Sequence, residues 1–214
     1  MKNGKKILLI TACAVLLVVA SVMGTLAYLT DSESVKNTFT VGSVGLSLDE
    51  AKVDKMGVSQ GSRWQPSEQD SAQEYHLLPG HTYVKDPTVT VDAGSEESYV
   101  RMIVTVNFAE ALTDAELATN LDNIFTGYEK TTWVRHSRTV AADSKSIVYE
   151  YRYFETVDGT DGKLPALFSG FTVPGTYTNE QIAALDEMTI DVVAHAIQAE
   201  GFADADAAWA EFKS

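Results

Sequence analysis

The strongest constraint on the fold of this chain is a period-two alternation of apolar and polar residues from Tyr99 to Phe108. Successive side chains of a β-strand point to opposite faces, so the pattern predicts a strand with one buried and one solvated face. Strands of this kind are typical of antiparallel sheets. The apolar face carries Val100, Met102, Val104, Val106 and Phe108, and the polar face carries Arg101, Thr105 and Asn107.

Other runs also predict strands, and turn signals between them predict antiparallel pairing. Thr82–Val91 should form a hairpin with Tyr99–Phe108, and the turn Asp158–Gly162 should close Ser146–Val157 against Leu164–Val173. The polar stretch 51–75 lacks a clear period and is expected to be a long loop anchored by Trp64 and Tyr75. The remaining predicted strands are Asn37–Leu48, with a β-bulge at Gly42-Ser43 where the alternation changes phase, Trp133–Val140 and Met188–Ala199.

Three segments have apolar residues at helical spacing. Ala109–Ile124 is predicted to be a helix or two short turns, Thr178–Glu187 a second short helix, and Ala203–Phe212 a terminal amphipathic helix. About seven or eight strands with short helices and no βαβ rhythm favour an all-β fold, an antiparallel β-sandwich of jelly-roll type with short helical insertions.

The N-terminus has the pattern of an export signal. Lys2, Lys5 and Lys6 precede an apolar run from Ile7 to Met23, and small residues follow, so we predict cleavage between Ala27 and Tyr28. A retained membrane anchor is one alternative, because the apolar run is long enough to span a bilayer. Acylation of Cys13 as a lipoprotein is the other, although few apolar residues precede that cysteine.

Cleavage would change the composition in two ways. The mature chain loses three lysines and no acidic residue, so its formal charge moves from −14 to −17. It also loses Cys13, the only cysteine, so disulfides are excluded and a core, a metal or assembly must stabilise the protein. Strong acidity argues against binding to nucleic acid or to an anionic membrane surface.

Sites for catalysis or metal binding are weakly indicated. The four histidines are dispersed and lack zincin spacing, and there is no Gly-x-Ser-x-Gly elbow. Glu74, His76 and His81 are a weak candidate metal set, and Asp158 and Asp161 a weak candidate calcium loop for which a hairpin turn is the preferred interpretation. We predict no catalytic residue and no cofactor. The tyrosines at 149, 151 and 153 are expected on a buried strand face.

Three stretches together resemble one family. They are the signal ending in Gly24–Asp31 with Asn37–Gly42 after it, the run from Leu78-Pro79-Gly80-His81 through Lys85-Asp86-Pro87 to Ser98-Tyr99-Val100, and the end from Ile190 to Trp209. These stretches resemble TasA/camelysin-type proteins, whose signals are removed by a SipW-type signal peptidase. The resemblance implies a secreted jelly-roll subunit of biofilm-matrix or cell-surface fibres in a Gram-positive bacterium, assembled by donor-strand exchange. It also implies self-association, an accessory matrix subunit as a further partner, and membrane contact only through the uncleaved signal.

The expected organisation is a signal peptide at 1–27, an exposed N-terminal segment at 28–38 and a jelly-roll domain at 39–214. The exposed segment contains no proline or glycine from Tyr28 to Asn37, so it can pair along an open sheet edge by main-chain hydrogen bonds. Leu29 and Val35 share a parity and would enter an acceptor groove, although Asp31 and Glu33 share that parity. The expected assembly residues are Tyr28, Leu29, Thr30, Asp31 and Val35.

Two other functions and one other state of this terminus remain open. Camelysin-type relatives imply a secreted metalloprotease, and a retained N-terminal helix would make the chain a membrane-anchored adhesion domain. For the terminus itself, a frayed polar end is the alternative to a donor strand.

Overall fold

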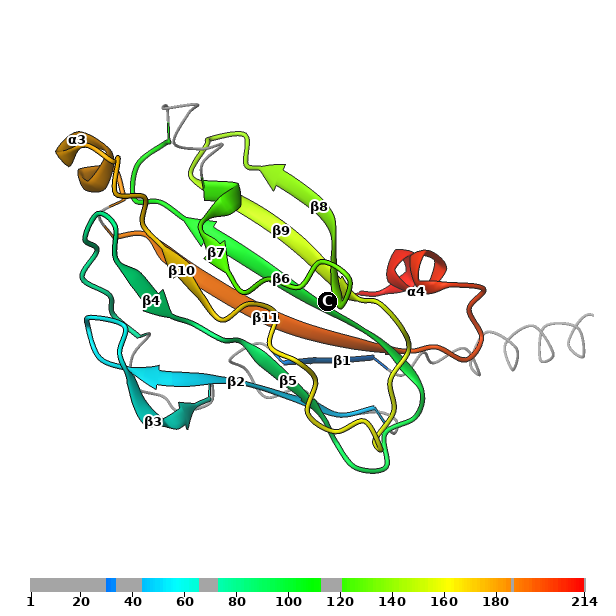
Figure 1. The fold of residues 1–214 in the computed structure, drawn as a ribbon. Coiled ribbons are helices and arrows are strands. Elements are labelled where there is room, and N and C mark those ends of the chain that lie inside the picture. The colour runs from blue at the N-terminus through cyan, green and yellow to red at the C-terminus, as the bar shows by residue number, and fades with distance from the viewer. Residues whose placement is uncertain (1–29, 34–43, 66–72, 113–120, 186, 214) are drawn as a thin grey trace, which may run out of the picture.

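The alternating run forms β6 (Ser98–Asn107), the central strand of a five-stranded antiparallel sheet in the order β1-β11-β6-β9-β8 (Figure 1). Its burial alternates along its whole length, as the sequence predicts. The computed structural model describes residues 30–33, 44–65, 73–112, 121–185 and 187–213. The other strands of this sheet are β1 (Thr30–Glu33), β8 (Trp133–Val140), β9 (Ser146–Tyr153) and β11 (Thr189–Gln198).

Two smaller antiparallel sheets face the large one. The first has the order β3-β2-β5 and the second the order β4-β10-β7. Their strands are β2 (Leu46–Val53), β3 (Ser59–Trp64), β4 (Thr82–Val84), β5 (Thr88–Val91), β7 (Phe125–Thr126) and β10 (Gly170–Thr172). The described residues are therefore mostly β, with antiparallel sheets and two short helices.

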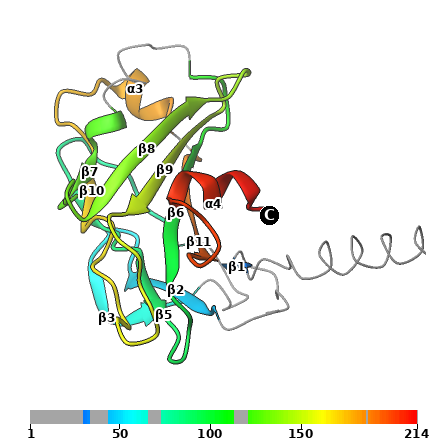
Figure 2. The same cartoon turned by 90° about the vertical axis from the view of Figure 1, so that its right-hand side faces the viewer.

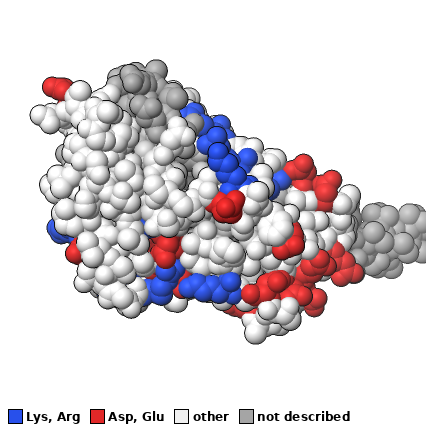
Figure 3. All heavy atoms as spheres, in the orientation of Figure 1, with Lys and Arg blue, Asp and Glu red and all other residues white. Residues whose placement is uncertain are grey.

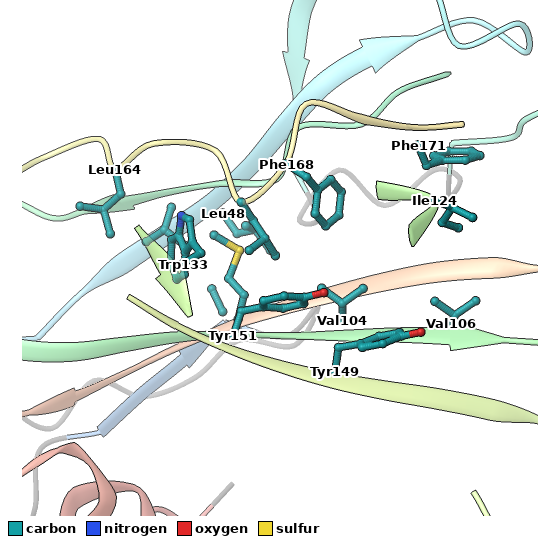
Figure 4. Close-up of a cluster of buried hydrophobic side chains, with 14 of the residues drawn as sticks. Leu48, Val104, Val106, Ile124, Trp133, Tyr149, Tyr151, Leu164, Phe168 and Phe171 are labelled. Carbon is teal, nitrogen blue, oxygen red and sulfur yellow. The ribbon is translucent and has the colours of Figure 1, made fainter. Parts of the chain in front are cut away.

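The core lies between the large sheet and the two smaller ones (Figure 4). Tyr149 and Tyr151 project inward from β9 toward Phe168, and Leu48 of β2 comes from the opposite side. Phe168 stacks on Phe125 at 4.4 Å between ring centroids. Tyr149 and Tyr151 are buried, as predicted, whereas Tyr153 at the end of the strand is only partly buried.

Two of the predicted hairpins are wrong. Thr82–Val91 is divided by Lys85-Asp86-Pro87 into β4 and β5, and β5 pairs with β2 instead of β6. The turn at Asp158–Gly162 leads back along β5, where Leu164 N–H donates to Val89 O at 2.9 Å, so β9 does not pair with Leu164–Val173. Only Gly170–Thr172 of that run is a strand, because it pairs with β4 and β7.

The predicted long loop at 51–75 is also wrong in part. β2 continues to Val53, and β3 returns beside it after a turn. Arg63 of β3 binds Asp86 at 2.5 Å and also contacts Asp49, so ion pairs hold a strand most of whose residues are polar. Tyr75 packs edge-to-face on Phe171 at 5.2 Å, as expected of an anchor.

Two of the three predicted helices are confirmed in shorter form, whereas residues 109–112 of the predicted 109–124 helix are not helical. The helix α3 (Asn179–Ala183) begins with a capping box in which Thr178 and Gln181 bond reciprocally. The terminal helix α4 (Ala205–Glu211) is capped by Asp204, whose side chain accepts from Ala207 N–H at 2.9 Å. Within the predicted 109–124 helix, a 3₁₀ turn spans Leu121–Asn123, and residues 113–120 lie outside the described residues, as does the predicted bulge at Gly42-Ser43.

Candidate assembly edge

The expected assembly segment contributes β1, the outermost strand of the large sheet. β1 runs antiparallel to β11, with Thr30 opposite Ile197 and Glu33 opposite Ala194. Figures 1 and 2 both show β1 beside β11, at the end of the sheet where α4 lies. Thr30 and Asp31 are therefore in a sheet ladder, whereas Tyr28, Leu29, Val35 and the cleavage site after Ala27 lie outside the described residues.

β1 covers only part of the β11 edge. β11 pairs with β6 from Thr189 to Gln198, whereas β1 pairs with Ala194–Ile197 alone. Among the described strands, none pairs with Thr189–Val193 on the side away from β6. Main-chain groups on an open edge can accept a further strand.

A groove of 1010 Å³ lies along this open part of β11. One side is formed by Thr189–Val193 and the other by Leu48–Glu50 of β2. Aromatic and aliphatic side chains line much of the remainder, namely Trp64, Tyr75, Leu77, Phe171, Ile182 and Met188. An open strand edge beside an apolar groove is the geometry that strand addition uses, because the main chain supplies affinity and the groove takes alternate side chains.

The opposite edge of the sheet is protected against pairing. β8 has a register shift between Arg135 and Ser137, and its sequence places Arg135, His136 and Arg138 close together. Figure 3 shows Lys and Arg gathered in a stripe over β8. Bulges and charged residues are the usual features by which edge strands avoid pairing with other chains. The two edges of the sheet therefore differ in their ability to accept a strand.

The C-terminal helix packs on the outer face of the sheet next to β1 (Figure 2). The Arg101 guanidinium of β6 lies 4.3 Å from the Trp209 ring centroid and 4.8 Å from that of Phe212. Arg101 Nε also donates to His195 Nδ1 at 3.2 Å, and the His195 ring contacts Phe212. These cation–π and hydrogen-bond contacts connect α4 to the strand that β1 pairs with.

Burial of His195 disfavours its charged form. Burial is the main cause, and the positive charge of Arg101 adds to it. Together they lower the pKa of His195 from 6.5 to about 4, although the negative charge of Glu150 acts in the opposite direction. The neutral imidazole accepts the Arg101 hydrogen bond, which an imidazolium cannot do. The sequence shows His195 in a strand, and its role in holding α4 depends on contacts that residue spacing does not reveal.

The weak metal set does not form one cluster. Glu74 pairs with Lys55 at 2.9 Å, and this contact lowers the pKa of its exposed carboxyl. His81 Nε2 lies 2.9 Å from Met56 O, and its ring packs on Tyr83. His76 shares the groove wall with Glu74. No group of three metal-binding side chains is found within the described ranges.

Asp158 and Asp161 lie together in a self-bonded turn. Asp158 Oδ1 accepts from both the N–H and the hydroxyl of Thr160 at 2.6 Å, and Asp161 Oδ2 accepts from Asp158 N–H at 2.7 Å. The Thr160 hydrogen bonds lower the pKa of Asp158. Both carboxylates are thus used by the turn itself, although this turn does not close the predicted hairpin between β9 and Leu164–Val173.

A buried polar cluster at one side of the groove was not identified from the sequence. Glu50 of β2 and Lys85 form an ion pair of 2.7 Å, with side chains only 8% and 7% exposed. Gln73 donates to the same carboxylate at 2.8 Å. Residue parity could have indicated this cluster, because Glu50 continues the buried face of Leu46 and Leu48, and Lys85 continues that of Tyr83.

None of the helices in the described part of the chain is long and apolar enough to cross a membrane, and residues 1–27 are not part of it. Comparison with protein families, with curated proteins and with solved structures finds no match to this chain. The likeness to TasA/camelysin-type proteins therefore stays a resemblance carried by the quoted motifs.

Proposed function

We propose that this chain is a secreted structural subunit of extracellular fibres, with a jelly-roll β-sandwich fold. In this proposal the N-terminal segment freed by cleavage after Ala27 donates a strand to the next subunit. The supporting observation is the position of β1, which forms the edge of the large sheet beside β11 and lies in the expected assembly segment. In the structure β1 pairs with β11 of its own chain. After exchange, β1 of one subunit would form the same ladder with β11 of the next subunit.

Exchange of an identical element costs little free energy because the contacts made between subunits replace equal contacts within one subunit. Residues 34–43 connect β1 to the β2 side of the molecule, so they would become the connection between subunits. No described strand pairs with Thr189–Val193 on the side away from β6, so a donor longer than the four paired residues of β1 could pair there beside the groove. The protected β8 edge would restrict pairing to one side of the sheet, which favours a linear fibre.

The length of the N-terminus is expected to control assembly. A chain that begins at Tyr28 is expected to form elongated oligomers, whereas a chain that begins at Thr38 lacks β1 and should stay monomeric. Light scattering and electron microscopy of the two purified proteins measure this difference. Equal monomeric behaviour of both chains would rule out the donor-strand mechanism.

A cysteine pair distinguishes pairing within one chain from pairing between chains. Asp31 and Ala196 are directly opposite in the β1–β11 register, so cysteines at both positions are within disulfide distance. In a chain that begins at Tyr28 and lacks other thiols, oxidised fibres of Asp31→Cys/Ala196→Cys should give a ladder of covalent multimers on a non-reducing gel. Each single-cysteine variant is the control. A product that is monomeric under the same conditions would show pairing within one chain only.

A further inference from the structure

Buried Glu50 and Lys85 and half-buried Gln73 together hold the groups that an amide exchange needs. Glu50 Oε2 accepts from Lys85 Nζ at 2.7 Å, and Glu50 Oε1 accepts from Gln73 Nε2 at 2.8 Å. One carboxylate therefore bridges an amine and the amide nitrogen that would leave if that amine attacked. An acid–base catalyst of such an exchange must contact both groups, because it takes a proton from one and gives a proton to the other.

The carbonyl side of the same amide is also held. Gln73 Oε1 accepts from Val53 N–H at 2.6 Å, so a fixed main-chain donor faces the oxygen on which negative charge would develop. Gln73 Nε2 also donates to Ala51 O at 3.0 Å, which fixes the plane of the amide. The main chain of β2 thus orients the electrophile, while its Glu50 side chain bridges the two nitrogens.

The two charged groups of this cluster are largely removed from water, whereas Gln73 is half-buried beside the groove. The Lys85 and Glu50 side chains are 7% and 8% exposed, and Trp64 of β3 is directly opposite Glu50 in the strand register. The Tyr75 side chain lies nearby. Its burial, and to a lesser extent the negative charges of Glu50 and Asp86, raise the pKa of its hydroxyl well above the usual value. Two opposite charges in such a site are costly to maintain, and neutralisation of the pair removes that cost.

We propose that Lys85 and Gln73 form an internal isopeptide bond with Glu50 as the acid–base catalyst. Lys85 Nζ passes a proton to Glu50, and the resulting amine adds to Gln73 Cδ while the carbonyl oxygen is held by Val53 N–H. Glu50 gives this proton to Nε2 and takes the second proton of the attacking nitrogen, the Cδ–Nε2 bond breaks, and ammonia leaves. An ammonium group, a carboxylate and a primary amide become a secondary amide, a carboxylic acid and ammonia, so no oxidant or external reagent is needed.

Such a bond would give a cysteine-free mature chain a covalent constraint that survives outside the cell. It would connect the segment after residues 66–72 to the β4–β5 junction, both beside the groove. This modification is independent of fibre assembly, because it involves residues of one chain and no strand exchange. Assembly and cross-linking can therefore each fail without affecting the conclusion about the other.

Intact-mass measurement of the purified protein tests the proposal. The expected mass is lower than the sequence mass by one ammonia, and trypsin should fail to cut after Lys85. After digestion by a protease that cuts after glutamate, cleavage at Glu74 separates Gln73 from Lys85 in sequence, yet the two fragments should remain joined. An unmodified mass together with normal tryptic cleavage after Lys85 would overturn the proposal.

Variants distinguish this bond from ammonia loss elsewhere in the chain. Lys85→Arg keeps a cation beside Glu50 and removes the nucleophile, and Glu50→Gln keeps the shape and removes the base, so each should show the full mass. Lys55→Arg is the matched control, because Lys55 forms a 2.9 Å pair with Glu74 on the surface, at 76% and 71% exposure. It should still lose one ammonia. Retention of the linked fragments in Lys85→Arg would also refute the assignment.

Discussion

Replacing Trp133 by alanine is expected to lower the free energy of unfolding by about 3–5 kcal/mol. Trp133 is fully buried at the start of β8, and its ring packs edge-to-face on Tyr153 at 5.1 Å. Its indole N–H donates to Pro165 O at 2.9 Å, across the core from the large sheet. The substitution would leave a large cavity and an unpaired carbonyl, and both effects destabilise the folded state.

Urea denaturation followed by circular dichroism measures this loss. Val134→Ala is the neighbouring control, because Val134 is 47% exposed and its truncation should change stability by no more than about 0.5 kcal/mol. If Trp133→Ala lost less than about 1 kcal/mol, the indole would not be part of a close-packed core.

Acidification is expected to destabilise the protein through His195. Its pKa is about 4 in the folded state and 6.5 when unperturbed, so the unfolded chain binds a proton at pH values where the folded chain does not. The stabilisation is fully present above pH 6.5 and is lost as the pH falls toward 4. At about 1.4 kcal/mol per pKa unit, the expected loss is about 3 kcal/mol.

Denaturation at pH 7, 5.5 and 4 in the wild type and in His195→Gln measures this contribution. Carboxylates titrate in both proteins, so the difference between the two pH profiles isolates the histidine. His136→Gln on the exposed β8 strand is the control for loss of a histidine outside the α4 contacts. Parallel profiles for wild type and His195→Gln would show that His195 does not titrate differently on folding.

Local pattern was sufficient where burial follows the period of the element. The alternation at 99–108 predicted β6 with its correct inward face, and the run 188–199 predicted β11. The terminal helix was predicted by its amphipathic pattern, and it places Ala208 and Trp209 in a small core with Ile197. In each case the period of the strand or helix sets which residues share a face, so the local sequence shows which face is buried.

Strand partners were not predictable in the same way. Thr82–Val91 reads as one β-rich run, but Pro87 lacks an N–H, and Asp86 accepts from Ala51 N–H at 2.5 Å. The chain therefore changes sheet between β4 and β5. β3 was missed because its residues are polar and its position depends on Arg63 binding Asp49 and Asp86, which are distant in sequence.

The candidate assembly edge was likewise predictable from the sequence only in part. Sequence reasoning selected the N-terminal segment as one that can pair with an open edge, and Thr30 and Asp31 of that segment lie in β1. It could not identify β11 as the partner strand or locate the groove, because both result from contacts between residues more than a hundred positions apart. The buried Glu50–Lys85 pair is a similar case, since parity indicates burial but not which charge meets which.

The sequence by itself determined that this chain is β-rich, which faces of its strands are buried, and that an unbroken segment without proline or glycine precedes the first core strand. These properties depend on residue periodicity and backbone preference, which are local. Only the tertiary structure decided which strands pair, which part of β11 lacks a second partner among the described strands, and which polar side chains meet in the interior. Those outcomes depend on long-range packing and charge pairing, which no local pattern encodes.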